Sequence, residues 1–187
     1  MTAGRSKRPE PVPFAVSLLL DDASAGEVER LWSALAEADL SRSMLELGHP
    51  PHVTLGVYEH LDTPATIRAI EALLVRAVRL PVRFNDIGVF PGEPGVLYLG
   101  PASDELASIH RHLHHAVGDD AHPHYRPESW VPHCTLATGL SPTRLDAARA
   151  LIAGLGPTIG GMLDAIDLVR FSPIESLWRR PLGHGIV

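Results

Sequence analysis

Pro51-His52-Val53-Thr54-Leu55 in the first half of the chain returns in the second half as Pro132-His133-Cys134-Thr135-Leu136. Side chains alternate between the two faces of a β-strand, so each copy would present its His and Thr on one face and two apolar residues to a core. Proline has no backbone N–H to donate to a strand ladder, which suits the position just before each strand. The pair therefore predicts two strands that each display an imidazole beside a hydroxyl.

Matched surroundings decide whether such a pair is meaningful, because a single His-x-Thr strand is common on protein surfaces. From Leu20, where an apolar run ends, to His52 is 32 positions, and from Leu99 to His133 is 34. In both halves a strand, a helix and a loop lead to the motif, and a further helix and strand follow it. Alternation and capping residues predict strands at 14–20, 52–58, 82–89, 96–99, 133–140, 162–171 and 174–180, and helices that start at Ser24, Thr63, Ser103 and Ser141.

This element order indicates an internal duplication. Two halves related by a pseudo-two-fold axis would bring both motif strands to one cleft. A length of 187 residues suits a single domain. We expect that domain over residues 14–187, with a first half near 14–90 and a second near 95–182. Residues 1–13 are basic and proline-rich without an apolar stretch, so they predict a disordered lead-in and not a secretory signal.

Composition narrows the classes of partner. The formal net charge is −6, whereas proteins that hold long nucleic acid usually carry a basic face. We therefore expect a small phosphorylated ligand or an RNA end and not a long duplex. No run approaches the roughly 20 apolar residues that cross a bilayer, so no membrane association is expected. With a single cysteine, Cys134, the chain can form no intramolecular disulfide, which is compatible with the reducing cytoplasm. We also expect a monomer.

The paired motifs and the element order from residue 14 to about 180 resemble the 2H phosphoesterase superfamily. That group contains 2′-5′ RNA ligases and 2′,3′-cyclic nucleotide phosphodiesterases. The resemblance implies an α+β, bilobal fold in which two pseudo-symmetric lobes with antiparallel sheets enclose a central cleft. It also implies phosphodiester chemistry that uses no metal ion and no cofactor.

Acid–base chemistry supports the same interpretation from the residues alone. Opening a cyclic phosphodiester needs a base to take a proton from water and an acid to protonate the leaving oxygen. Histidine, with an ordinary pKa of about 6.5, can supply both near pH 7. We therefore expect His52 and His133 to be the catalytic base and acid, in an order that the sequence leaves open. Thr54 and Thr135 would donate hydrogen bonds to the non-bridging oxygens.

Other residues are candidates for lining the cleft. Tyr58 shares the predicted strand face of His52, although a surface tyrosine is an equal alternative. Tyr125, Arg126 and Trp130 lie in the loop before the second motif, where an aromatic ring could stack on a base. A tryptophan just before a strand more often packs into the core.

Family members that join or cleave RNA often have an arginine shortly after the second motif. Here that segment reads Ala137-Thr138-Gly139, which favours hydrolysis over ligation.

A histidine-rich segment offers a different site. His110 and His114 are four residues apart on a predicted helix, a spacing that can grip a metal ion. We expect instead a solvated helix face, and no metal site. The sequence therefore predicts a hydrolase that opens a 2′,3′-cyclic nucleotide or an RNA 2′,3′-cyclic phosphate end. The alternatives are a module that only binds a nucleotide or RNA end, a 2′-5′ RNA ligase, and a metal-dependent hydrolase.

Overall fold

The computed structural model describes residues 13–74, 78–101, 103–118, 120–171 and 173–183. Except for Pro13, the predicted lead-in of residues 1–13 lies outside this part of the chain. The described strands are β1 (Phe14–Leu20), β2 (His52–Tyr58), β3 (Leu80–Phe90), β4 (Gly95–Pro101), β5 (Cys134–Leu140), β6 (Ile159–Arg170) and β7 (Glu175–Pro181). β1 and β2 have the predicted bounds, and each of the other strands differs from its predicted range by at most three residues at either end.

All seven of these strands belong to one antiparallel sheet, in the order β2-β1-β6-β3-β4-β5, and β7 also pairs with β6. The sequence repeat runs β1-β2-β3 and then β4-β5-β6, so each half lends its third strand to the other half. β6 pairs with β1 and β3 pairs with β4. β1 pairs with β2, β3 with β4, β4 with β5 and β6 with β7, which are consecutive in the chain, whereas β6 also pairs with β1 and β3 from the first half.

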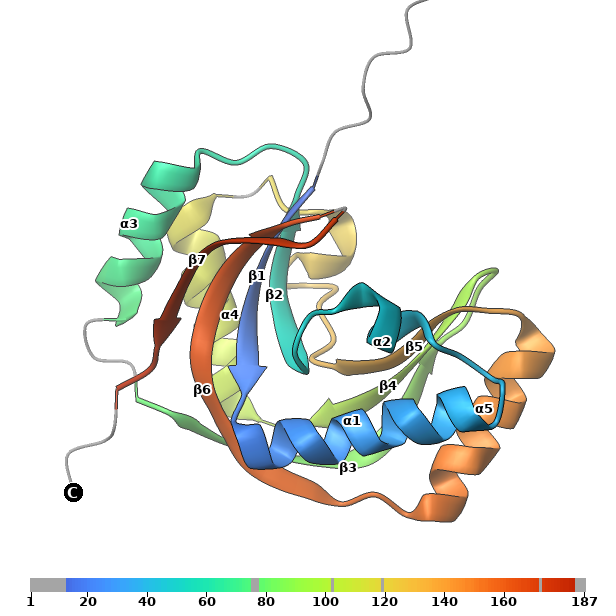
Figure 1. Ribbon diagram of the computed structural model, residues 1–187. Coiled ribbons are helices and arrows are strands. Elements are labelled where there is room, and N and C mark those ends of the chain that lie inside the picture. The colour runs from blue at the N-terminus through green and yellow to red at the C-terminus, as the bar shows by residue number, and fades with distance from the viewer. Residues whose placement is uncertain (1–12, 75–77, 102, 119, 172, 184–187) are drawn as a thin grey trace, which may run out of the picture.

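The sheet has two arms, shown in Figure 1. The first arm contains β2, β1, β6 and β7, and the second arm contains β3, β4 and β5. They meet where Leu80–Phe84 of β3 pairs with Ile159–Leu163 of β6. The expected α+β bilobal fold with antiparallel sheets is confirmed, and this pairing makes the two sheets continuous.

Helices are exchanged between the halves in the same way. The described helices are α1 (Asp22–Glu37), α2 (Ser43–Leu47), α3 (Thr63–Leu74), α4 (Asp104–Val117) and α5 (Pro142–Leu155), with a 3-10 turn η1 at Pro123–Tyr125. α3 packs on α4, and α4, from the second half, covers β2 in the first arm. α1 lies against β6 and also reaches β5 and α5, and α5 covers β4 (Figure 1). Each half thus helps to bury the other's strands.

Two helix starts differ from the prediction. Asp21, not Ser24, caps α1, because its carboxylate accepts a hydrogen bond from the Ser24 backbone N–H at 2.9 Å. Asp62, not Thr63, accepts the equivalent bond from Ala65 at the start of α3. Ser103 and Ser141 cap α4 and α5 as predicted. None of the described helices has the length and apolar character needed to cross a bilayer.

Candidate active site

Both motif strands carry a β-bulge just after the His-x-Thr sequence. In the β1–β2 ladder the pairing skips Leu55, and in the β4–β5 ladder it skips Leu136. An extra residue in one strand reverses which face the following side chains point to. Val57 and Thr138, five residues beyond each motif histidine, therefore lie on the same side as that histidine and line the same cavities.

The same bulge corrects the expectation for Tyr58. Simple alternation would place this ring beside His52, but the bulge at Leu55 turns it to the opposite face. There it is 1% exposed and lies near His114 of α4, with ring centroids 6.5 Å apart. Tyr58 thus packs in the core and lines neither of the cavities described below.

Equivalent backbone carbonyls hold both motif histidines. Nδ1 of His52 lies 2.7 Å from the carbonyl of Pro50, and Nδ1 of His133 lies 2.7 Å from the carbonyl of Val131. A carbonyl oxygen can only accept, so each Nδ1 carries the proton. Nε2 of each neutral ring then holds a lone pair. The two imidazoles are therefore held in the same tautomer by the same device.

A tryptophan from the opposite half supports each motif strand. The indole N–H of Trp32, on α1, donates to the carbonyl of Thr135 at 3.1 Å. The indole N–H of Trp130 donates to the carbonyl of Thr54 at 3.0 Å. The Trp130 ring also stacks on His110, with centroids 3.9 Å apart and planes 3° apart. Of the two alternatives for Trp130, stacking on a base and packing into the core, the structure shows packing.

The motif threonines lie next to their histidines on the cleft side. Thr54 is 8% exposed, and its hydroxyl is 3.3 Å from the hydroxyl of Ser17 on β1. Thr135 is more open and lines a cavity with His133. Since β2 contacts β5, the two motifs approach one another, and the Cys134 thiol lies against the backbone of His52.

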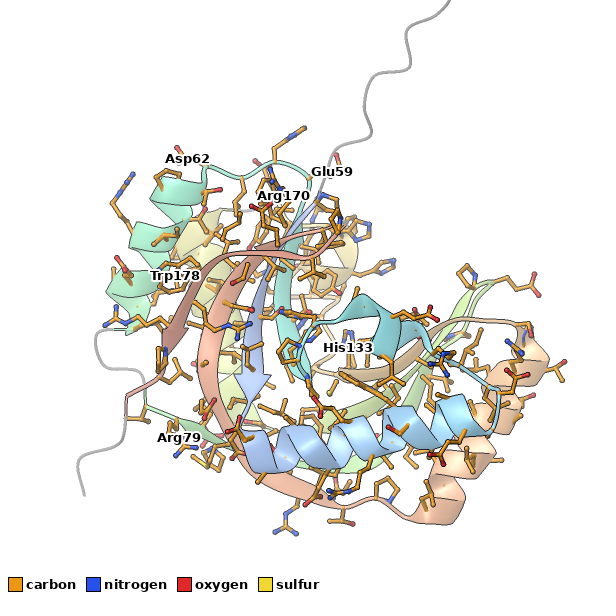
Figure 2. The ribbon with its side chains drawn as sticks, viewed as in Figure 1. Glu59, Asp62, Arg79, His133, Arg170 and Trp178 are labelled. Carbon is orange, nitrogen blue, oxygen red and sulfur yellow. The ribbon has the colours of Figure 1, made fainter. Side chains whose placement is uncertain are left out.

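Polar groups surround His52. Its Nδ1 is also 3.1 Å from Nδ1 of His49, and Nε2 of His49 is 3.0 Å from the Asp167 carboxylate on β6. Arg179 on β7 donates to the same carboxylate oxygen at 3.1 Å. His133, by contrast, has aromatic neighbours: Phe90 meets it edge-on at 5.0 Å between centroids, and Tyr98 lies at 5.5 Å. Figure 2 shows His133 between the two arms of the sheet.

Burial disfavours the charged form of both histidines. It lowers the pKa of His52 to about 4, with a further contribution from the nearby His49 and a smaller one from His133. Burial also lowers the pKa of His133 below its ordinary value. Without a bound anion, both rings are therefore neutral at pH 7.

Two adjoining cavities lie along these residues. The small cavity, of about 130 Å³, is lined by Ser17, His49, His52 and Thr54 among others. The large cavity, of about 700 Å³, is lined by Phe90, Val131, His133 and Thr135 among others. Val57, Tyr125 and Phe171 line both. Among the described residues that line the two cavities, none is Lys, Arg, Asp or Glu.

Of the other two residues expected to line the cleft, Tyr125 does so and Arg126 does not. Tyr125 borders both cavities, whereas Arg126 is exposed and donates to the Ala121 carbonyl at 3.4 Å, outside either lining.

The expectation that His110 and His114 lie on a solvated helix face is wrong. They are 1% and 2% exposed: the Trp130 ring stacks on His110, and His114 lies near Tyr58 of β2. Nε2 of His110 lies 2.9 Å from the Tyr125 carbonyl, and burial lowers its pKa to about 4. In the described part of the chain, no three His, Cys, Asp or Glu side chains are grouped as a metal site would need.

Sequence reasoning missed Trp32, His49, Asp167, Phe90 and Tyr98. His49 stands three residues before His52 and is the one member that proximity in sequence could have indicated. Asp167 reaches it from 118 positions away, through the pairing of β1 with β6.

The chain resembles known proteins in its sequence pattern as well as in this geometry. The pattern of the 2′-5′ RNA ligase superfamily matches residues 20–173. No protein of curated function matches the chain by sequence.

Among solved structures, the Thermus thermophilus protein TT0787 is similar with a TM-score of 0.66 and 17% identity, covering 92% of this chain and 98% of its own. E. coli LigT in its apo form is similar with a TM-score of 0.57 and 16% identity, and the match covers 94% of this chain and 100% of LigT. Kluyveromyces marxianus Usb1 is similar with a TM-score of 0.54 and 13% identity, and the match covers 92% of this chain and 99% of Usb1. At these identities the likeness shows the fold alone.

Proposed function

Since the chain belongs to the 2′-5′ RNA ligase superfamily, we propose that it opens a small cyclic phosphodiester by acid–base catalysis with His52 and His133. The substrate would be a 2′,3′-cyclic nucleotide or a 2′,3′-cyclic phosphate at an RNA end. The observation that carries the proposal is the matched pair of Nδ1–carbonyl bonds, each 2.7 Å long. They leave Nε2 as the nitrogen that a substrate in the adjoining cavities would meet.

In the proposed reaction a water oxygen forms a bond to phosphorus while the bond from phosphorus to a ribose oxygen breaks. One Nε2 takes a proton from the water, and the Nε2–H of the other ring protonates the leaving oxygen. Thr54 and Thr135 would donate hydrogen bonds to the non-bridging oxygens as charge shifts onto them. The bound phosphate would also favour the charged form of the histidine that acts as the acid, which is neutral in the free protein.

The lining of the cavities supports a small substrate with a single phosphodiester. Backbone phosphates of a long RNA are usually met by Lys and Arg, and the described lining contains neither. A volume of about 700 Å³ is in the range that holds one nucleoside-sized ligand, and Phe90, Tyr125 and Phe171 offer rings to a base. E. coli LigT has been crystallised with 3′-AMP and with phosphate, which fits a nucleotide ligand here.

The test is hydrolysis of a panel of nucleoside 2′,3′-cyclic phosphates, with and without EDTA, by wild type, His52→Ala and His133→Ala. Each variant should lose roughly 10²–10⁴-fold in rate. His112→Ala is the matched control, because His112 is an exposed histidine on α4, whereas His110 and His114 are buried. If the wild-type protein binds nucleotides but does not hydrolyse them, the enzyme proposal fails and the alternative of a nucleotide-binding module is favoured. EDTA-sensitive activity that both motif variants retain would reject the two-histidine mechanism.

A further inference from the structure

His110 on α4 is a buried polar side chain whose contacts lead to the wall of the site. It is 1% exposed, its Nε2 lies 2.9 Å from the Tyr125 carbonyl, and its ring stacks on Trp130. Burying a polar group is costly unless it forms hydrogen bonds, and an apolar side chain would fill the same space without that cost. Packing alone therefore does not explain an imidazole at this position.

The hydrogen bond of His110 has a fixed direction. Burial lowers the pKa of His110 to about 4, so the ring is neutral at pH 7 and carries a single N–H. The Tyr125 carbonyl can only accept, which places that proton on Nε2. His110 therefore donates a hydrogen bond from α4 to the backbone of η1.

The loop that contains η1 is also anchored to the first motif strand, on either side of this bond. The backbone N–H of His122 donates to the Val57 carbonyl at 2.7 Å. At the other end of the loop, the indole N–H of Trp130 donates to the Thr54 carbonyl at 3.0 Å. The bond at Tyr125 lies between these two anchors. The loop is thus held from β2 at its ends and from α4 at its middle.

The bond at Tyr125 bears on the site because this residue forms part of both cavities. Tyr125 lines the small cavity beside His52 and the large cavity beside His133. Its ring is one of those that the proposed nucleotide would meet, and an aromatic ring stacks on any base. A shift of the Tyr125 backbone would move this ring. The N–H of His110 therefore sets the wall against which a base would bind.

The face of the His110 ring supports a different part of the site. It stacks on the Trp130 indole with centroids 3.9 Å apart and planes 3° apart. The same indole donates to the carbonyl of Thr54, whose hydroxyl the proposed reaction uses. The backbone of Leu55, the bulge residue that follows Thr54, also lies near the His110 ring. The stack therefore supports the His-x-Thr end of β2, whereas the N–H supports the cavity wall.

We propose that His110 is a positioning residue of the active site, which holds the Tyr125 wall through its Nε2–H and the first motif through its stack on Trp130. This rests on the proposed phosphodiesterase function and adds to it a residue that acts only through these two neighbours. Because the two supports use different parts of one ring, separate substitutions can remove them.

Two variants of His110 separate the supports. His110→Phe keeps an aromatic ring against Trp130 but has no donor. On 2′,3′-cyclic AMP its KM should rise at least about fivefold, the lower end of what stacking of one base contributes, while kcat stays within about twofold of wild type. His110→Gln keeps a donor near the position of Nε2 but loses the ring. Its kcat should fall about tenfold through the displaced motif, while KM stays within about twofold of wild type.

A purely structural role predicts a different result, in which both kinetic constants follow the urea midpoint. Ile70→Ala is the reference for that case, because Ile70 is 1% exposed on α3, which packs on α4, and it lines neither cavity. This variant should lower the urea midpoint and leave kcat and KM unchanged. His112→Phe makes the same substitution at an exposed position of α4 and should match wild type. If both His110 variants behave like Ile70→Ala, or if their KM and kcat change in the same proportion, the positioning role is rejected.

Binding and the tautomer of His110 are measured without turnover. Wild type and His110→Gln should bind 3′-AMP with similar affinity, and His110→Phe should bind it at least about fivefold more weakly. Long-range ¹H–¹⁵N NMR spectra of wild type should show the His110 proton on Nε2, and a proton on Nδ1 would overturn the link to Tyr125. If wild type hydrolyses no cyclic nucleotide, the proposed function fails, and 3′-AMP binding then decides the role of His110. Equal affinities of wild type and His110→Phe, or no binding by either, would overturn the positioning role as well.

Discussion

Trp32 lies in the first half of the chain, yet Trp32→Phe should weaken the hold on the second motif strand. Trp32 is 4% exposed, and its indole N–H donates to the Thr135 carbonyl at 3.1 Å. Phenylalanine keeps most of the ring packing but has no donor, so a partly buried carbonyl loses its partner. Leaving such a group unsatisfied costs about 1–3 kcal/mol. At about 2–4 °C per kcal/mol for a chain of this size, the melting temperature should fall by about 4–8 °C for a loss near 2 kcal/mol.

Activity should fall in the same variant. Thr135 and His133 belong to the same strand end, and a shift of about 1 Å in a catalytic group can cost about 10²-fold in rate. We therefore expect kcat on a 2′,3′-cyclic nucleotide to fall by about tenfold or more.

The matched control is Trp178→Phe. Trp178 is partly buried on β7 against the core, and its indole N–H donates to no described residue. The substitution deletes the same atoms without breaking a hydrogen bond. Urea titration and turnover of both variants give the comparison. If Trp32→Phe is as stable and as active as Trp178→Phe, the indole–carbonyl bond does not hold the motif strand, and the cross-support argument fails.

Two further predictions concern groups that the fold keeps uncharged. Burial lowers the pKa of His52 and of His110 to about 4, and lowers that of His133, so between about pH 6.5 and 4 the unfolded chain binds more protons than the folded one. The free energy of unfolding should therefore be highest above pH 6.5 and fall toward pH 4, and urea midpoints that stay flat over this range would contradict it. Burial raises the pKa of the Cys134 thiol to about 12 at 1% exposure. The native protein should then react with a thiol reagent only at the rate at which it unfolds, and rapid labelling at pH 8 without urea would show that the thiol is accessible.

Patterns that are local in sequence predict much of the fold. Alternation of apolar residues indicates the strands, and the caps at Ser103 and Ser141 are predicted correctly. At the start of α1, Asp21, Asp22 and Ser24 are all capping residue types, and propensity does not separate them. α2 is missed because a five-residue helix depends on its packing against β5.

The errors at the site have a different cause. Strict alternation places Tyr58 in the cleft because it ignores a bulge, and a bulge is set by the partner strand, where Val16 and Ser17 pair on either side of Leu55. His110 and His114 are expected in solvent because the helix pattern does not encode what covers them, which is the Trp130 ring at His110 and Tyr58 of β2 at His114. In the sequence nothing distinguishes Asp167 from Asp164 in the same strand, and only the order β1-β6-β7 shows that Asp167 faces His49.

Exchange of third strands explains why one site is built from two similar motifs with different surroundings. The carbonyl bonds at His52 and His133 are set within each half, so both halves keep them. The neighbours on the exchanged strands, β6 beside β1 and β3 beside β4, come from the other half and need not match. β6 and β7 bring Asp167 and Arg179 to the His52 side, whereas β3 and β4 bring Phe90 and Tyr98 to the His133 side. The proposed reaction needs an acid and a base of the same residue type in different electrostatic surroundings, and the strands around the two motifs provide that difference.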